Sequence, residues 1–234
     1  MIKVEDNIEE GFIEAINISF DEYNNKGARS TAKLKPVHSF IANYLHLKLN
    51  GNYEIYSQGF EEGREYQIDG KYYPKKEDIV VLNQNHDPLI AISFKFVTSN
   101  YKQNSNNYFE NLLGETANIR RVNIGFAHLL VLRGHTPYYN KNAGNKRGEE
   151  MKIEVLTDEN IAKYVKLFND NDFPHKPDVL GILVVDYNDK TQRMEKANLE
   201  DFNLSDETKR LLEGTLSVKS FLDKVYHLCK LKDQ

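Results

Sequence analysis

Two apolar runs joined by a short polar turn constrain the fold of this chain more than any other stretch. The first run covers residues 75–82 and ends in Ile-Val-Val-Leu, and the second covers residues 89–97. Short runs rich in β-branched residues, separated by Asn, Asp and Pro, are typical of two neighbouring strands. This stretch therefore predicts part of a β-sheet, around which the rest of the chain is organised.

Three polar side chains interrupt the apolar pattern of these runs. Asp78 begins the first predicted strand, and Ser93 and Lys95 lie two residues apart in the second. Residues two apart in a strand share a face of the sheet, so Ser93 and Lys95 are expected to point the same way. A lysine in so apolar a strand is costly to bury without a partner, and a carboxylate on the next strand is a natural one. Asp78 and Lys95 together predict a site for a divalent cation and an anionic substrate.

The remaining elements follow from the spacing of apolar residues. Helical spacing predicts helices over 8–24, 36–48, 104–121 and 158–169, and a C-terminal helix over 206–230 with a break near Gly214. Further strands are predicted over 53–59, 126–132 and 179–186, with a hairpin around Gly70 and a long loop over 133–150. This order predicts an α/β fold with one central mixed sheet flanked by helices, in a single domain over residues 1–234.

Composition narrows the classes of function. Because Cys229 is the only cysteine, an intramolecular disulfide and a cysteine-based zinc cluster are excluded. The sequence has no apolar run of the ~18 residues that span a bilayer and no signal-peptide layout, so we expect a cytoplasmic protein without a membrane partner. The net charge of −4 argues against a protein that coats nucleic acid nonspecifically. It does not argue against a nuclease, because metal-binding carboxylates lower the net charge.

The polar residues of the two runs also match a known motif. A carboxylate on one strand and a lysine on the next form the working set of metal-dependent phosphodiester hydrolysis. Asp78, fourteen further residues and then Ser93-Phe94-Lys95 resemble the PD-(D/E)xK motif of the restriction-endonuclease superfamily. Residues 99–115, an asparagine-rich turn followed by a helix that carries Glu and Gly, resemble the segment after the catalytic lysine in Xho-type type II restriction enzymes. The resemblance covers about residues 78–121.

The resemblance implies a restriction-endonuclease-like core over about residues 53–132 and a Mg²⁺-dependent type II restriction endonuclease. Asp78 and the backbone carbonyl of Phe94 would bind Mg²⁺, and Lys95 would act at the attacking water. Glu77 stands where the family usually has proline, and Ser93 stands where it usually has the second acid. Serine is a poor Mg²⁺ ligand, and in the family a glutamate of the following helix can replace the missing acid. Glu110 is the expected replacement, and Glu115 is the alternative.

Double-stranded DNA is the expected substrate. Residues after the catalytic strand could hold the DNA backbone or read base edges, since Asn pairs with adenine. The segment 133–150 is a candidate recognition loop. The candidate DNA-binding residues are Lys102, Asn104, Asn106, Asn107, Arg120, Arg121, Lys141, Asn142, Asn145, Lys146 and Arg147. Arg120 and Arg121 could instead only favour the C-terminal end of their helix, and the loop could be ordinary solvated surface. A palindromic target implies a homodimer, and the resemblance implies a cognate DNA methyltransferase in the same cell.

Other interpretations remain open. The chain could be a structure-specific or repair nuclease of the same fold. Because of Ser93, it could also be a DNA-binding protein whose catalytic site has decayed. Asp78 and Lys95 could form a buried ion pair in a structural sheet, and His128, inside an apolar strand, is expected to be a hydrogen-bonded core residue.

Overall fold

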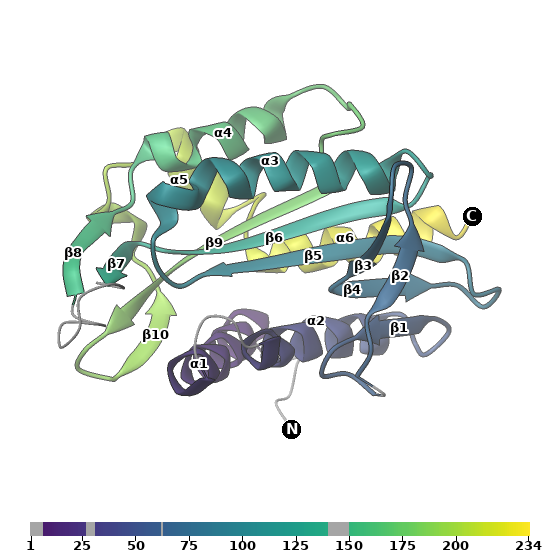
Figure 1. Cartoon of the computed structure of the whole chain (residues 1–234), viewed down its shortest axis with the longest axis horizontal. Coiled ribbons are helices and arrows are strands. Elements are labelled where there is room, and N and C mark those ends of the chain that lie inside the picture. The colour runs from purple at the N-terminus through teal and green to yellow at the C-terminus, as the bar shows by residue number, and fades with distance from the viewer. Residues whose placement is uncertain (1–6, 27–30, 62, 140–149) are drawn as a thin grey trace.

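A six-stranded mixed sheet forms the centre of the structure, a computed structural model that describes residues 7–26, 31–61, 63–139 and 150–234. The strand order is β1-β4-β5-β6-β9-β10, and helices cover both faces (Figure 1). The pairs β1–β4, β4–β5 and β9–β10 are antiparallel, whereas β5–β6 and β6–β9 are parallel. The prediction of an α/β fold with one central mixed sheet flanked by helices is confirmed.

The sheet and two small hairpins account for all ten strands in the described part of the chain. The strands of the central sheet are β1 (Glu54–Ser57), β4 (Ile79–Leu82), β5 (Pro88–Val97), β6 (Gly125–Arg133), β9 (Val179–Asn188) and β10 (Arg193–Lys196). The hairpins pair β2 (Tyr66–Asp69) with β3 (Pro74–Glu77), and β7 (His135–Tyr139) with β8 (Glu150–Val155).

Helices form a layer on each face of the sheet. One layer contains α1 (Ile8–Lys26), α2 (Lys35–Lys48) and α6 (Val218–Lys232), and the short 3-10 helix η1 (Thr31–Leu34) connects the first two. The other layer contains α3 (Tyr101–Arg120), α4 (Asp158–Asn169) and α5 (Asp206–Glu213). Gly214 ends α5, so the predicted break in the C-terminal helix is confirmed. In the described residues, every helix is too short or too polar to cross a membrane.

Side chains along β5 point alternately to the two faces of the sheet, and this determines which of them face the candidate site. Ile90, Ile92 and Phe94 belong to the core under α1, α2 and α6, whereas Ala91 and Val97 belong to the core under α3. Because side chains alternate along a strand, residues 93 and 95 face α3. The same alternation places the polar positions of β5 on one side of the sheet, as predicted.

One prediction of a strand start is confirmed and one prediction of a loop is wrong. The strand predicted to begin at Asp78 is β4, because the chain changes sheets at this residue: β3 pairs with β2, whereas β4 pairs with β1 and β5. The segment 133–150 is not one loop, because it contains the end of β6 and the whole of β7, and β8 begins at its last residue. β8 alternates charged and apolar residues, a pattern that could have indicated a strand in the sequence, although it is exposed at almost every position in the structure.

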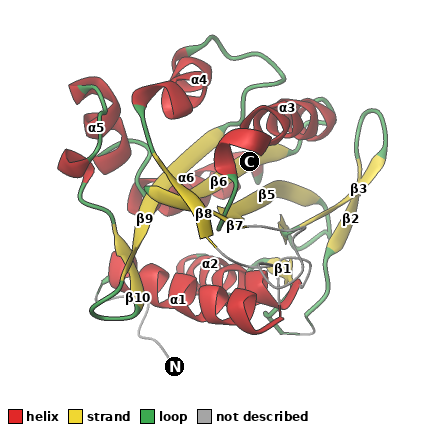
Figure 2. Ribbon diagram, turned by 60° about the vertical axis from the view of Figure 1, so that its left-hand side comes forward, coloured by secondary structure: helices red, strands yellow, loops and turns green. Residues whose placement is uncertain are grey.

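The β2–β3 hairpin is fixed to α3 by one buried residue. Asn118 of α3 is fully buried, and its Oδ1 accepts hydrogen bonds from the backbone N–H groups of Tyr72 at 2.9 Å and Tyr73 at 3.3 Å. Its Nδ2 donates to the Tyr73 carbonyl at 3.0 Å. A Cβ atom at Gly70 would collide with this amide, so the turn needs glycine there. The hairpin therefore has a defined position beside α3 (Figure 2).

His38 of α2 is buried without a polar partner, which predicts a loss of stability in acid. Its exposed fraction is 1%, its ring packs edge-on against Phe94 at 5.7 Å, and neither ring nitrogen has a hydrogen-bond partner among the described residues. Burial lowers the pKa of His38 to about 4. Between that value and the unfolded pKa of about 6.5, only the unfolded chain binds the proton. The contribution of neutral His38 to the free energy of unfolding is therefore complete above about pH 6.5. It decreases by about 3 kcal/mol as the pH falls toward 4.

The measurement is urea unfolding of the wild type and of His38→Leu at pH 7.5 and pH 4.5. The variant is expected to lose about 3 kcal/mol less than the wild type between these two pH values. Exposed His227 of α6 offers the matched control, since His227→Leu should follow the wild type. Equal acid sensitivity of His38→Leu and the wild type would contradict the prediction.

Candidate active site

A pocket of about 370 Å³ opens beside β5. Its lining comes from η1, from β3 and Asp78, from β5, from α3 and from His128 of β6. Asp78, Ser93 and Lys95 all line it, so the structure brings together the three residues of the predicted motif.

Asp78 lies where the chain passes from the small sheet to the central sheet. Its Oδ2 accepts a hydrogen bond of 2.8 Å from the backbone N–H of Phe94. Burial raises the pKa of Asp78, and the hydrogen bond from Phe94 and the charges of Lys75 and Lys95 oppose that rise only in part. The bond holds the Asp78 carboxylate against β5. Phe94, expected to supply a carbonyl ligand, thus also supplies an amide that orients the carboxylate.

Glu115, rather than Glu110, lies beside Ser93. The Ser93 hydroxyl donates to Glu115 Oε2 at 3.4 Å, and both residues line the pocket. Glu110 does not line it and is exposed, near enough to Lys163 of α4 to affect the pKa of that lysine. Five residues of α-helix correspond to a rotation of about 140°, which turns the two glutamates toward different sides of α3. The structure therefore places the alternative, Glu115, beside Ser93, and it does not place the expected Glu110 there.

Lys75 and Glu77 of β3 also line the pocket, although the sequence did not predict them there. The Lys75 ammonium lies 2.7 Å from Glu115 Oε1 and 3.5 Å from Glu77 Oε1. Burial raises the pKa of Glu77 to about 7. Burial lowers the pKa of Lys75, but attraction to Glu77 and Glu115 outweighs it and leaves that pKa raised. The signal that could have found them is the two-residue spacing in a strand, which places Lys75 and Glu77 on one face.

Lys95 is exposed at the pocket and is not an ion-pair partner of Asp78. Its ammonium lies 4.8 Å from the centroid of the Tyr108 ring of α3, and it makes no ion pair within the described residues. The interpretation of a buried Asp78–Lys95 ion pair is therefore not what the structure shows. The charge of Lys95 is felt by its neighbours, because it adds to burial in lowering the pKa of Lys33. Lys76 also lines the pocket, so lysines and carboxylates occur there together.

His128 is buried at the base of the pocket but is not hydrogen-bonded as expected. It pairs with Ser93 across the parallel strands β5 and β6, and its Nδ1 has no hydrogen-bond partner among the described residues. Burial, with the positive charges of Lys95 and Lys75, lowers the pKa of His128 to about 3. The imidazole is therefore neutral at neutral pH.

The oxygen donors of the pocket fit a hard divalent cation. In the described part of the chain, no group of three or more His, Cys, Asp or Glu side chains is arranged to hold a metal ion. Mg²⁺, however, is usually bound by one or two carboxylates, with waters and substrate phosphate as its other ligands. Asp78 and Glu115 provide two carboxylates, and Glu77 has a buried Oε1 without a hydrogen bond. The donor set therefore suits Mg²⁺ without forming a complete cage.

The predicted DNA-binding residues of α3 fall into two groups. Lys102 and Asn107 are exposed near the N-terminal end of the helix. Asn104 donates to a backbone carbonyl of the preceding turn at 3.3 Å, and Asn106 Oδ1 accepts from a lysine of α4 at 3.2 Å. The first two side chains are therefore better placed for an external partner. The candidates in the segment 133–150, namely Lys141, Asn142, Asn145, Lys146 and Arg147, lie outside the described residues.

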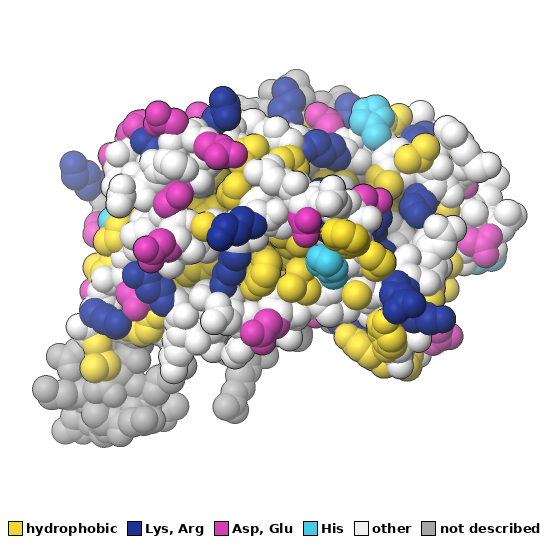
Figure 3. Space-filling model, turned by 90° about the horizontal axis from the view of Figure 1, so that it is seen from above, with side chains coloured by type: hydrophobic (Ala, Val, Ile, Leu, Met, Phe, Trp, Pro, Cys, Tyr) yellow, Lys and Arg dark blue, Asp and Glu magenta, His cyan; other side chains and the backbone are white. Residues whose placement is uncertain are grey.

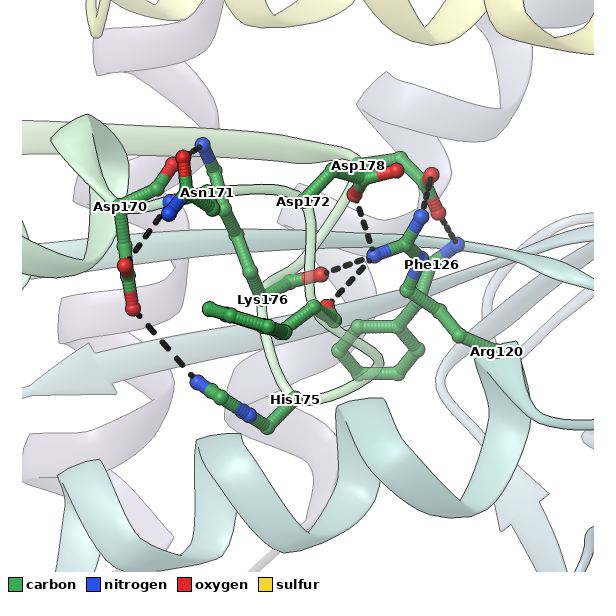
Figure 4. Close-up of polar contacts among 9 residues, drawn as sticks. Arg120, Phe126, Asp170, Asn171, Asp172, His175, Lys176 and Asp178 are labelled. Atoms are coloured by element: carbon green, nitrogen blue, oxygen red, sulfur yellow. Dashed lines mark hydrogen bonds and ion pairs between the residues drawn. The ribbon is translucent and has the colours of Figure 1, made fainter.

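Arg120 holds the end of α3 to the segment before β9 (Figure 4). Its Nη1 lies 2.8 Å from Asp172 and from the Lys176 carbonyl, and 2.9 Å from the Phe173 carbonyl. Its Nη2 lies 2.8 Å from Asp178. These contacts leave the guanidinium 16% exposed, which argues against the predicted DNA contact.

Arg120→Ala is expected to lower the free energy of unfolding by about 3 kcal/mol, because it leaves the mostly buried Asp178 without its cation. DNA binding by the folded fraction should stay within about twofold of the wild type. Urea unfolding and DNA binding by fluorescence anisotropy measure the two effects. For the unfolding measurement, the matched control is Arg121→Ala, because Arg121 is exposed and stacks on the Tyr72 ring instead. A stable Arg120→Ala with weakened DNA binding would restore Arg120 as a DNA contact.

The outer face of the α3–α4 layer does not present one kind of charge. Over the described residues seen from above, basic and acidic side chains are interspersed, with no continuous basic band (Figure 3). Phosphate backbones bind best along stretches of positive charge. The lysines around the pocket are therefore better candidates for meeting DNA than this face.

Comparisons of this chain with known proteins found no significant match. No protein-family model matches the chain, and neither the curated proteins nor the solved structures include a significant match.

Proposed function

We propose that the chain is a Mg²⁺-dependent type II restriction endonuclease that hydrolyses double-stranded DNA at a specific site. The observation that carries this proposal is the pocket itself. It combines Asp78, oriented by the Phe94 amide, with Lys95, and it adds Glu115 next to the serine that replaces the usual acid. Asp78 directly precedes β4, Ser93 and Lys95 lie on the paired strand β5, and Glu115 lies on the helix that follows. This order is similar to the arrangement implied by the resemblance to the PD-(D/E)xK superfamily.

Each residue has a chemical task in this proposal. Asp78 and Glu115 would hold Mg²⁺, with the Phe94 carbonyl as a further oxygen. Mg²⁺ bound there would polarise the scissile phosphate and stabilise its developing charge. The exposed ammonium of Lys95 would position the attacking water and stabilise negative charge on the phosphate. Tyr108 would limit the positions of Lys95 through the contact between its ring and the ammonium.

The expected partners follow from the type of enzyme. A palindromic site would be cut by a homodimer, with each subunit acting on one strand. A cognate methyltransferase would protect the DNA of the same cell. Lys102, Asn107 and Arg121 are the described candidates for DNA contact that remain exposed.

One observation favours a second candidate, a DNA-binding protein of the same fold without cleavage activity. Ser93 occupies the position of an acid, and the Lys75 ammonium already forms an ion pair with Glu115. Such a protein would bind DNA without a divalent cation. A structure-specific or repair nuclease is the other alternative from the sequence.

The test is a digest of a DNA of phage-genome size by the purified protein with Mg²⁺, beside an EDTA control. Discrete bands that disappear with EDTA are the expected result, and sequencing of the ends gives the site and the cut position. A smear, or preference for branched substrates, would favour the repair nuclease. DNA binding without cleavage in Mg²⁺ or Mn²⁺ would favour the binding protein and overturn the proposal.

A further inference from the structure

The Lys75 ammonium lies between two carboxylates of the pocket. It is 2.7 Å from Glu115 Oε1 on α3 and 3.5 Å from Glu77 Oε1 on its own strand. The Glu77 side chain is only 1% exposed, and those of Lys75 and Glu115 are 23% and 24% exposed. At such partly desolvated positions, opposite charges interact more strongly than on the open surface.

The position of Lys75 follows from how its hairpin is held. Asn118 fixes the tip of the β2–β3 hairpin to α3, and Glu115 lies one turn before Asn118 on the same helix. The two contacts attach the hairpin to α3 at two points, so β3 carries Lys75 to the glutamate. Lys75 is thus directed toward the carboxylates by the fold.

Lys75 and Lys95, which both line the pocket, have different surroundings. Lys95 contacts the Tyr108 ring and makes no ion pair with a described residue, whereas Lys75 contacts both glutamates. The positive charge that now neutralises Glu115 is therefore that of Lys75. A divalent cation that approaches Glu115 would be repelled by the Lys75 ammonium.

We infer that Lys75 is a resident counter-ion of the pocket, which a divalent cation must displace from Glu115 in order to bind. Metal binding and departure of the Lys75 ammonium are then two parts of one exchange, and Lys75 limits the metal affinity of the protein in the absence of DNA. The inference rests on the proposed function only in taking the pocket as a metal site. It adds a regulatory role for a lysine that lies outside the motif.

The test is the affinity of the DNA-free protein for Mn²⁺, measured from the electron paramagnetic resonance signal of free Mn²⁺. Lys75→Met should bind Mn²⁺ at least about tenfold more tightly than the wild type, because it removes the competing charge. The matched control is Lys71→Met, which removes the same charge from the exposed tip of the same hairpin. It should stay within about twofold of the wild type.

Lys75→Met leaves the buried Glu77 without its cation and could therefore fold poorly. A second pair of variants tests the inference without this unpaired charge. Glu77→Gln removes that carboxylate charge, and Lys75→Met/Glu77→Gln removes both members of the pair. The double variant is expected to bind Mn²⁺ at least about tenfold more tightly than Glu77→Gln alone. Circular dichroism and urea unfolding establish that each variant is folded before its affinity is compared.

The outcomes separate this inference from the proposed function. Equal Mn²⁺ affinity with and without Lys75 would overturn the inference and leave the metal site intact. Weaker binding without Lys75 would also overturn it, since Lys75 would then support the site. Absence of Mn²⁺ binding in every folded variant would overturn both the inference and the metal-dependent function.

Discussion

Glu115→Gln is expected to lower Mg²⁺-dependent DNA cleavage on the order of 10³-fold. The carboxylate of Glu115 lies beside Ser93, where the proposed site otherwise lacks an acid, and glutamine keeps its size but removes its charge. A metal ion in such a site contributes several kcal/mol to stabilising the transition state, which corresponds to a rate factor of this size. Initial rates on a substrate with the mapped site, across a range of Mg²⁺ concentrations, measure the loss.

The matched control for this prediction is Glu110→Gln on the same helix. Glu110 is exposed and lies outside the pocket, so this variant should cleave within about twofold of the wild type. Reversal of the two results would restore Glu110 as the replacement acid and would require α3 to rotate when DNA binds. Full activity of both variants would mean that neither glutamate holds the metal.

The sequence predicted the centre of the fold because apolar patterning determines it locally. β5 and its neighbours are short apolar runs bounded by polar turns, and α4 has the apolar spacing and the acidic first turn of a helix. For the same reason Asp78, Ser93 and Lys95 could be assigned to one site. The two-residue spacing of Ser93 and Lys95 places them on one face of a strand, and Asp78 directly precedes the neighbouring strand, so the sequence suggests that the three lie close together.

The parts that the sequence did not predict depend on contacts between distant residues. Lys75 and Glu77 precede the strand that was predicted to begin at Asp78, and their place in the pocket depends on a hairpin fixed by Asn118, more than forty residues later. The choice of Glu115 over Glu110 depends on the rotation of α3 against β5, which spacing along one helix does not give. Arg120 contacts partners 52 to 58 residues further along the chain, so its sequence position suggested only the end of a helix.

Lys95→Ala is expected to lower cleavage by about 10²- to 10³-fold while leaving the fold intact. An ammonium aimed at a reacting phosphate contributes rate factors of this size through proton transfer and charge stabilisation. The side chain is exposed, so its removal should change the free energy of unfolding by less than about 0.5 kcal/mol. Single-turnover cleavage measures the first effect, urea unfolding the second, and anisotropy with Ca²⁺ in place of Mg²⁺ measures DNA binding.

Two comparisons make the Lys95 result specific. Lys166→Ala removes an exposed lysine of α4 that does not line the pocket, and it should cleave like the wild type. Lys95→Arg keeps the charge but replaces a compact ammonium with a planar group that cannot give up its proton, so it should recover less than about a tenth of the lost rate. Undiminished cleavage by Lys95→Ala would remove Lys95 from the reaction. In that case Lys75, which lines the same pocket and contacts Glu115, would be the next lysine to test for an ammonium at the phosphate.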